Sequence, residues 1–434
     1  MKRRAMTIPA AAAATALLLA ACGGGDSEGQ DAPPAEEFDT EEPVTLSMTV
    51  WGNDDRAARY QESIDLFNEE YPNIDVQLNF AAWNDYWPAR ATEAASSSLP
   101  DIVQMDLSYL RQFGERNQLL DLEPYLDEYI DVSAMEETVL ASGQLGEATY
   151  AIPTGTNVLS LHYNQTVLDQ LGVEVPSEDY TWSEYNEWIT AASEAGAGLD
   201  PQLYGGMDYS GVFWMFALHM TQQGNEVFND EGIAFTEEDM AEWLESTAEL
   251  REGGQTFPTD RTIQLAPKTG FTNNQVATEF NWDNMISLAI ADSGTEDMGL
   301  LVPPSSEDGE KALFSKPAMF LSVAANSEEP EAAALLVDFL TNDPEVGGIF
   351  GTSRGLPASE TQRDGVTLEG VDAMVAEYEE AVADDITATV PQPVEGFGSL
   401  EATYLRLSEE LGLGSITVDE FVDAWFAEAE QLLN

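Results

Sequence analysis

The stretch VTLSMTVW, residues 44–51, alternates apolar and polar side chains, which is the pattern of a β-strand. Residues 57–67 follow with apolar side chains at helical spacing, and Tyr71-Pro72 predicts the end of that helix. Residues 74–80 alternate again and predict a second strand. The chain therefore begins its fold as strand, helix, strand.

The same order continues along the chain. An alanine-rich segment, residues 84–98, predicts a second helix, and the short apolar run 102–105 predicts a third strand. Strands that alternate with helices indicate an α/β fold with a parallel sheet and right-handed crossovers. In open parallel sheets, ligands bind beyond the carboxyl ends of the strands. We therefore expect a binding site where these three strands end.

An aromatic side chain next to a short polar one follows each predicted strand. Aromatic faces stack on the apolar faces of sugars, and carboxylate or amide groups hydrogen-bond sugar hydroxyls. A single tryptophan at such a position is better explained by ordinary packing, but the coincidence at three strand ends favours a binding site. The candidates at the strand ends are Trp51, Asn53, Asp54, Trp83, Asp106 and Tyr109.

The middle of the chain contains two segments that we interpret as crossings between two lobes. Residues 150–157 are extended and punctuated by Pro and Gly, and a new strand is predicted to begin at Leu159. Residues 298–304 are short, apolar and end in Pro, like a second crossing. Between them, Trp282 lies among polar residues, which fits a cleft better than a core.

Several local signals predict the elements of the second half. Thr181 with Glu184 fits a capping box, and residues 228–233 resemble a hairpin followed by a helix capped by Thr236. After an apolar strand at 318–325, Ser327 is expected to cap a helix. The last helix carries one continuous apolar stripe from Val418 to Leu432. We expect Trp182, Trp188, Trp243 and Trp425 in the core.

The N-terminus predicts export and anchoring. Residues 1–4 are basic, residues 8–21 are apolar, and Leu19-Ala20-Ala21-Cys22 looks like a bacterial lipobox. That likeness implies cleavage after residue 21 and a lipid on Cys22, the only cysteine of the chain. The alternative is an ordinary secretory signal with an incidental cysteine. Residues 22–43 are charged and rich in Gly and Pro, and predict a disordered tether.

The net charge of the chain limits the classes of molecule that it can bind. Asp and Glu number 80 against 16 Lys and Arg in 434 residues, so the formal net charge is −64. Such a surface excludes nucleic acid and disfavours anionic ligands, and it suits a salty medium. Lys and Arg are also sparse around the predicted cleft. With two isolated histidines and no thiol left after lipidation, we expect no metal site.

The chain as a whole resembles the extracellular solute-binding proteins of ATP-driven importers, in the branch that binds sugars and oligosaccharides. The likeness covers residues 44–434 and depends on the order and spacing of several short motifs together. The segments that carry it are 101–106 with 119–122, 152–157 with Tyr163-Asn164, Thr181-Trp182 with Gly205, 316–325, and 354–357.

This resemblance implies an α/β, two-lobed, periplasmic-binding-protein-like fold with the ligand cleft between the lobes. Residues 44–153 with about 303–350 would form lobe 1, and about 154–302 with 351–434 would form lobe 2. It also implies closure on ligand, delivery to a membrane permease, no cofactor and no catalysis, and we expect a lipid-anchored monomer on the outer face of the membrane. The implied ligand contacts are Trp51, Asn53, Asp54, Trp83, Asp106, Tyr109, Asn157, Trp214, Trp282, Arg354 and Phe397.

Other functions stay open at this level. Residues 351–355 match the nucleophile-elbow pattern, but Pro357 interrupts the helix that this motif needs, and both histidines come earlier in the chain. A glycosidase needs two facing carboxyl groups, which the many acidic residues do not exclude. A receptor for a peptide or compatible solute is a third possibility. Arg354 has an alternative role as a partner in a salt bridge.

Overall fold

The computed structural model describes residues 42–433, except residues 127, 178, 230–231 and 389. The described residues belong to one compact unit. The predicted signal peptide, Cys22 and nearly all of the predicted tether lie outside the described residues.

The first half of the chain folds as predicted. Strands β1 (Val44–Trp51), β2 (Ile74–Ala81) and β3 (Ile102–Met105) are parallel, with β1 in the middle. Helix α1 (Asp54–Glu70) connects β1 to β2, and α2 (Trp83–Ala95) connects β2 to β3. The inward side chains of β1 at Leu46, Met48 and Val50 are fully buried. The predicted alternation and helical spacing are therefore confirmed.

One long strand, β6 (Ile152–Asn164), continues the sheet into the second half of the chain. Its first part pairs with β11 (Ser315–Val323), and its second part pairs with β9 (Thr278–Trp282) and β10 (Met298–Leu301). The separate crossing and strand expected at 150–163 are therefore a single strand. The segment expected as a second crossing at 298–304 forms β10, which pairs only with the end of β6.

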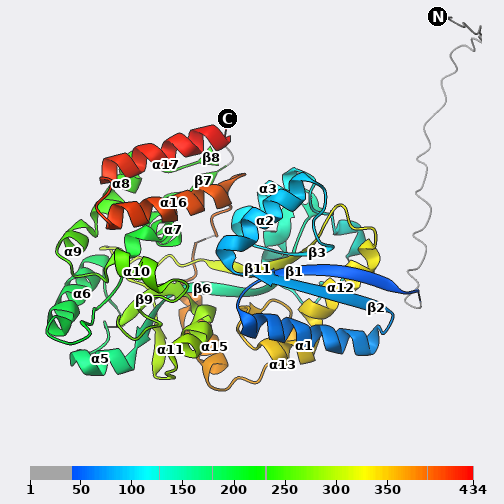
Figure 1. The fold of residues 1–434 in the computed structure, drawn as a ribbon, viewed down its shortest axis with the longest axis horizontal. Helices are drawn as coiled ribbons and strands as arrows, with labels where there is room; N and C mark the ends of the chain where they lie inside the picture. Colours follow the sequence, from blue (N-terminus) through cyan, green and yellow to red (C-terminus); the bar gives the residue numbers. More distant parts are fainter. Residues whose placement is uncertain (1–41, 127, 178, 230–231, 389, 434) are drawn as a thin grey trace, which may run out of the picture. The chain divides into compact units, whose positions relative to one another are not determined.

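The sheet is mixed rather than purely parallel, because β11 runs antiparallel to both β3 and β6. The strand order is β10-β6-β11-β3-β1-β2. Figure 1 shows β6 and β11 running between the helices packed on β1 to β3 and the helices of the second half. These two strands thus join the two halves of the fold through backbone hydrogen bonds.

The second half is mostly helical. The capping box at Thr181 and the hairpin are confirmed, and Thr236 caps α8. Helices α16 and α17 pack on each other, as Figure 1 shows near the C-terminus. The elements here are α5 (Gln165–Leu171), α6 (Trp182–Gly196), α7 (Phe213–Gln222), β7 (Phe228–Asn229), β8 (Gly232–Ile233), α8 (Glu237–Glu245), α9 (Ala248–Glu252), α10 (Thr259–Leu265), α11 (Ile286–Ser293), α15 (Val371–Val382), α16 (Phe397–Gly412) and α17 (Val418–Leu433).

Shorter elements complete the fold around β3 and β6. They include α3 (Leu107–Glu115), α4 (Glu137–Leu140), β4 (Gln144–Leu145), β5 (Ala148–Thr149), α12 (Pro330–Asn342), α13 (Pro344–Phe350), β12 (Leu356–Pro357), α14 (Glu360–Arg363) and the 3-10 turns η1 (Glu123–Tyr125), η2 (Ala141–Gly143), η3 (Tyr209–Gly211), η4 (Asp283–Met285) and η5 (Ala383–Asp385). Helix α14 packs against α12 and α13. The predicted lobe boundaries, which separate α14 from those helices, stay a prediction.

Two local predictions need correction. Ser327 does not cap a helix: α12 begins at Pro330, and the Ser327 hydroxyl instead donates to Asp101 Oδ1 at 2.7 Å. A proline at the first helical position already has the backbone angle that a helix needs, so it fixes the start without that cap. Trp188 is only half-buried, whereas Trp182, Trp243 and Trp425 lie in the core as expected.

The last helix supplies the first testable prediction. Trp425 is fully buried against α16, while Leu432 on the same helix is 39% exposed. Replacing a buried tryptophan by alanine removes apolar contacts and leaves a cavity, so Trp425→Ala should lower the free energy of unfolding by about 3–5 kcal/mol. Urea unfolding measures this change. The matched control Leu432→Ala should cost less than about 1 kcal/mol, and an equal cost for the two variants would contradict the placement of Trp425.

Candidate functional site

Aromatic side chains gather where β1, β2 and β3 end. The ring of Trp51 packs edge-on against Trp83, with centroids 5.1 Å apart, and Trp87 stacks on Tyr109 at 3.6 Å and 10°. Trp83 is 38% exposed, so part of this cluster faces solvent. Sequence analysis missed Trp87, although it follows Trp83 by one helical turn on α2 and so lies on the same face.

Three members of the cluster, Trp83, Trp87 and Tyr109, line a pocket of about 280 Å³. Its walls come from α2 and α3 on one side and from Ser399 and Ala402 of α16 on the other. Two lining residues each have a buried polar atom without a hydrogen-bond partner among the described residues, namely the donor Trp87 Nε1 and the acceptor Gln112 Oε1. An apolar pocket with a few unpaired polar atoms is the usual form of a small-molecule site.

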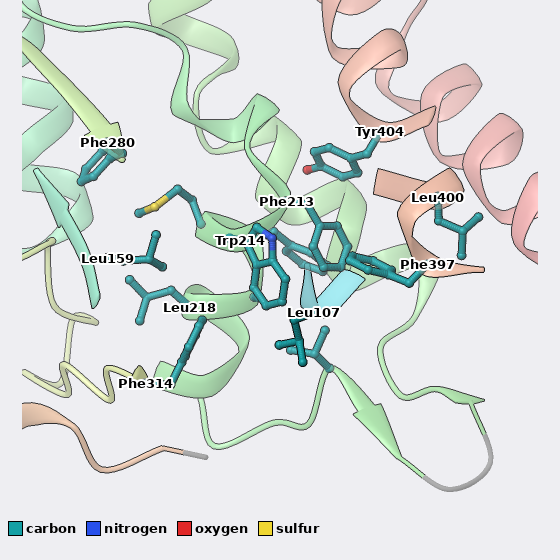
Figure 2. Packing of buried hydrophobic residues seen from close by; sticks show 14 of the residues in the cluster. Leu107, Leu159, Phe213, Trp214, Leu218, Phe280, Phe314, Phe397, Leu400 and Tyr404 are labelled. Atoms are coloured by element: carbon teal, nitrogen blue, oxygen red, sulfur yellow. The ribbon is translucent and has the colours of Figure 1, made fainter. Parts of the chain in front are cut away.

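Helices α3 and α16 approach each other closely beside this pocket. The Tyr109 hydroxyl donates to the Gly398 carbonyl at 3.2 Å. A β-carbon at position 398 would lie 2.3 Å from the Tyr109 ring, so glycine is required for this approach. The neighbouring Phe397 is fully buried and packs on Phe213 of α7, as Figure 2 shows. Its ring therefore lies in the core.

A buried charged group lies next to the aromatic cluster. Lys316 of β11 forms an ion pair with Asp106 at 3.0 Å, and its ammonium lies 5.2 Å from the Trp282 ring centroid and 5.7 Å from that of Trp214. The sequence predicted few cations at the cleft, but β11 places this lysine directly between Asp106 and the two tryptophans. Strand pairing also puts Lys316 opposite Asn157 of β6.

Glu401 of α16 completes this group. Trp214 Nε1 donates to its Oε1 at 2.8 Å. Burial, together with the nearby Asp106 carboxylate, raises the pKa of Glu401 to about 7, although Ser108, Lys316 and Trp214 act in the opposite direction. Sequence analysis missed both Lys316 and Glu401, because no local pattern marks a polar residue that tertiary packing brings to a cleft.

The remaining predicted contacts lie elsewhere. Asn53 caps α1, and Asp54 is an exposed residue of its first turn. Asn157 is buried, and its amide donates to Asn284 Oδ1 at 3.3 Å. Arg354 is 2% exposed, lies 3.7 Å above the Phe350 ring and donates to the Leu340 carbonyl. No ion pair of Arg354 occurs within the described part of the chain, contrary to the alternative role considered for it.

The structure therefore separates the predicted site residues into three sets. Trp83 and Tyr109 line the aromatic pocket, and the buried Trp51 packs against Trp83 and Trp87 behind it. Asp106, Trp214 and Trp282 surround Lys316. Asn53, Asp54, Asn157, Arg354 and Phe397 make structural contacts of their own.

A larger hollow of about 800 Å³ lies between α3, the β7–β8 hairpin and residues 390–395. None of the described residues that line it is a predicted ligand contact. Unlike the aromatic pocket, this hollow contains no unpaired buried polar side-chain atom among the described residues. The aromatic pocket is therefore the better candidate for ligand.

The geometry does not support a catalytic serine in the elbow-like motif at residues 351–355 or a metal site among the described residues. The Ser353 hydroxyl of the elbow-like motif donates to the Phe350 carbonyl at 2.7 Å, which is a local turn contact. No group of three or more His, Cys, Asp or Glu side chains suited to a metal ion occurs within the described ranges.

Comparison with known protein families matches residues 62–383 to the bacterial extracellular solute-binding proteins. The chain belongs to this family. The two-lobed fold is that of solved solute-binding proteins from Listeria monocytogenes, in complex with cycloalternan, and from Yersinia enterocolitica, in complex with saturated digalacturonic acid. Each has a TM-score of 0.77 and covers 90% of this chain; the chain in turn covers 99% and 98% of their lengths, at 18% and 20% sequence identity.

A curated relative of this solute-binding protein is the arabinooligosaccharide-binding protein of Halalkalibacterium halodurans. The two are 24% identical over 212 residues, a match that spans 45% of each chain. Within the described residues, no helix of this solute-binding protein has the length and apolar character needed to cross a bilayer.

The second prediction concerns the pH dependence of stability. Because its folded-state pKa is raised to about 7, Glu401 binds a proton more tightly in the folded state than in the unfolded state. The folded state therefore loses stability as pH rises from the usual range of a glutamate through about 7. The Glu401→Gln variant, whose side chain cannot ionise, should lose less stability than the wild type between about pH 5 and about pH 8.

Urea unfolding at several pH values tests this prediction. Glu279 and Glu379 also have pKa values raised to about 7 by burial, so part of the slope should remain in the variant. Glu409→Gln, at an exposed position of the same helix, is the matched control and should keep the wild-type slope. A Glu401→Gln slope equal to that of the wild type would contradict the assignment.

Proposed function

We propose that this chain is an extracellular receptor that binds a neutral oligosaccharide between its lobes and delivers it to an ATP-driven importer. The observation that carries the proposal is the aromatic pocket beside α16, with its unpaired donor and acceptor and the polar group of Asp106, Lys316 and Glu401 next to it. The name of the relative from Halalkalibacterium halodurans points to an oligosaccharide ligand; the Yersinia enterocolitica structure also holds an oligosaccharide, but an acidic one, so the neutrality of the ligand is argued from charge below.

The proposed roles follow from the chemistry of each side chain. Trp83 and Trp282 stack on the apolar faces of sugar rings, and Trp87 Nε1 donates a hydrogen bond to a hydroxyl. Asp106 and Glu401 accept hydrogen bonds from hydroxyls. Of the other predicted contacts, Trp51, Tyr109 and Trp214 pack against these groups, and Asn157 lies opposite Lys316 on β6. Asn53 and Asp54 are exposed where α1 begins, and Arg354 and Phe397 lie in the core.

A neutral ligand fits the charge of the site. Lys316 is already paired with Asp106, so it has no free charge to offer a ligand carboxylate. The large negative charge of the whole chain would repel an acidic sugar over a longer range.

Binding without bond cleavage also fits these contacts. A retaining or inverting glycosidase needs one protonated and one ionised carboxyl group facing the sugar. Here both carboxyl groups are engaged by the protein, since Lys316 and the Ser108 N–H hold Asp106 and Trp214 donates to Glu401. Because the pKa of Glu401 is raised to about 7, recovery of intact sugar is the deciding test between receptor and glycosidase. The proposed mechanism is instead a shift of population: the ligand contacts both lobes, binds the closed arrangement more tightly and so favours it.

We further propose that the protein is a monomer held on the outer face of the membrane by lipid on Cys22, with residues 22–43 as its tether. A flexible tether raises the effective concentration of the receptor at its permease. Mass spectrometry of the exported protein would detect a lipidated N-terminal cysteine, and an unmodified N-terminus would contradict the anchor.

The third prediction tests ligand class and site together. In isothermal titration calorimetry, arabinotriose or maltotriose should bind saturably, and digalacturonic acid should bind more weakly or not at all. Trp282→Ala should weaken the binding of the neutral sugar by about 2 kcal/mol or more, which is about 30-fold. Trp188→Ala, a half-buried tryptophan of α6, is the control and should leave the affinity unchanged.

Chromatography of the same samples separates receptor from enzyme. The sugar should be recovered intact, and released monosaccharide would overturn the receptor proposal. Absence of binding by both neutral sugars would overturn the proposed ligand class. Unchanged affinity in a folded Trp282→Ala variant would remove Trp282 from the site.

A further inference from the structure

Strand β6 changes its partners between two adjacent residues. Val158 is the last residue that pairs with β11, opposite Ser315, and Leu159 is the first that pairs with β9, opposite Trp282. This point is where the strand passes from one half of the fold to the other. The contacts made here therefore decide how Trp282 lies relative to Lys316 on β11.

The buried carboxyl group of Asp283 holds this point together. Its Oδ2 accepts from the Val158 backbone N–H at 3.2 Å, and its Oδ1 accepts from the Asn284 N–H at 2.6 Å. Asn284 in turn accepts from the Asn157 amide. Because Asp283 directly follows Trp282 in the chain, these bonds fix the proposed stacking residue to β6.

A second carboxyl group, Glu379 of α15, meets Asp283. Glu379 lies against Asp283, close to the Thr156 side chain and the Leu356 backbone, and its buried Oε1 has no hydrogen-bond partner among the described residues. The preceding residue, Tyr378, donates to the Leu159 carbonyl at 2.6 Å. Helix α15 thus contacts β6 on both sides of the partner change.

Two adjacent carboxyl groups that are largely shielded from water repel each other when both are ionised, which favours the form in which one of them is protonated. Burial is the main cause that raises the pKa of Asp283 well above its usual range and that of Glu379 to about 7. Among the neighbouring charged groups, Arg363 of α14 stabilises the ionised form of Glu379 and so lowers its pKa. Tyr378 lies near Asp283 and near Asp385 of η5, and these carboxylates disfavour ionisation of the tyrosine.

We propose that Asp283 and Glu379 are positioning residues of the ligand site, and that the proton they share keeps Trp282 and Asn157 in the arrangement that binds ligand. This inference rests on the proposed function. When the proton is lost, the two carboxylates repel each other, α15 separates from β6, and Trp282 loses its fixed place. Ligand binding at high pH must then take up one proton from the solvent.

The fourth prediction is a pH profile of affinity, measured with arabinotriose and maltotriose by calorimetry from about pH 6 to about pH 10. Wild-type affinity should fall as the shared proton is lost, by up to about tenfold per pH unit for one linked proton. Glu379→Gln provides a neutral group that hydrogen-bonds an ionised Asp283, so its affinity should fall less steeply with pH than that of the wild type. Glu401 is present in both proteins, and its own titration therefore cancels in the comparison.

Two further variants separate positioning from loss of structure. Asp283→Asn has one acceptor oxygen in place of two, so one backbone N–H at the partner change loses its acceptor and affinity should fall at every pH. Glu380→Gln, at the next and exposed position of α15, should keep the wild-type profile. Thermal unfolding of each variant checks that it is folded at the pH of the measurement.

The outcomes distinguish this inference from the proposed function. If neither sugar binds at any pH, the proposed function is wrong. If a sugar binds and Glu379→Gln shows the same pH profile as the wild type, the positioning role is wrong while the receptor function stands. A flat wild-type profile also overturns the positioning role.

Discussion

The hydrogen-bond ladder of β6 is the constraint on which the rest of the molecule depends. One strand satisfies the backbone groups of β11 with its first half and those of β9 and β10 with its second half. Buried backbone groups must be paired, so neither half of the fold can move away without breaking these bonds. Relative motion of the halves is therefore concentrated where β6 changes partners. The proposed ligand residues Asn157 and Trp282 lie next to that place in sequence or in register.

The buried ion pair of Lys316 and Asp106 belongs to the same arrangement. A buried ion pair stabilises the folded state little more than apolar side chains of similar size would. Removing one partner is nevertheless strongly destabilising, because it leaves a buried charge without compensation. Here the pair links β11 to the start of α3, and the two tryptophan rings near the ammonium add favourable cation–π contacts. The ion pair thereby places two charged side chains beside the rings of Trp214 and Trp282. Because the two charges are opposite, the pair adds no net charge to the site.

Elements with a local signal could be predicted from sequence, and elements that depend on distant contacts could not. The alternation in β1 and β2, the capping box at Thr181 and the hairpin at residues 228–233 each lie within a few neighbouring residues. The continuity of β6 was missed because Pro153 and Gly155 are residue types that often end a strand, whereas here Pro153 pairs with β11 and Gly155 pairs with both β11 and β12. Trp51, Trp83 and Tyr109 were found because topology places strand ends together. Lys316 and Glu401 were missed because β11 and α16 reach the site only through tertiary packing.

The close approach of Tyr109 to Gly398 has a practical consequence for engineering. It sets the Tyr109 ring between a backbone carbonyl of α16 and the face of Trp87, so two chromophores report on the spacing of two helices from different parts of the chain. A change in the spacing of α3 and α16 would therefore alter the surroundings of Trp87. Its intrinsic fluorescence offers a way to follow that spacing without an external dye.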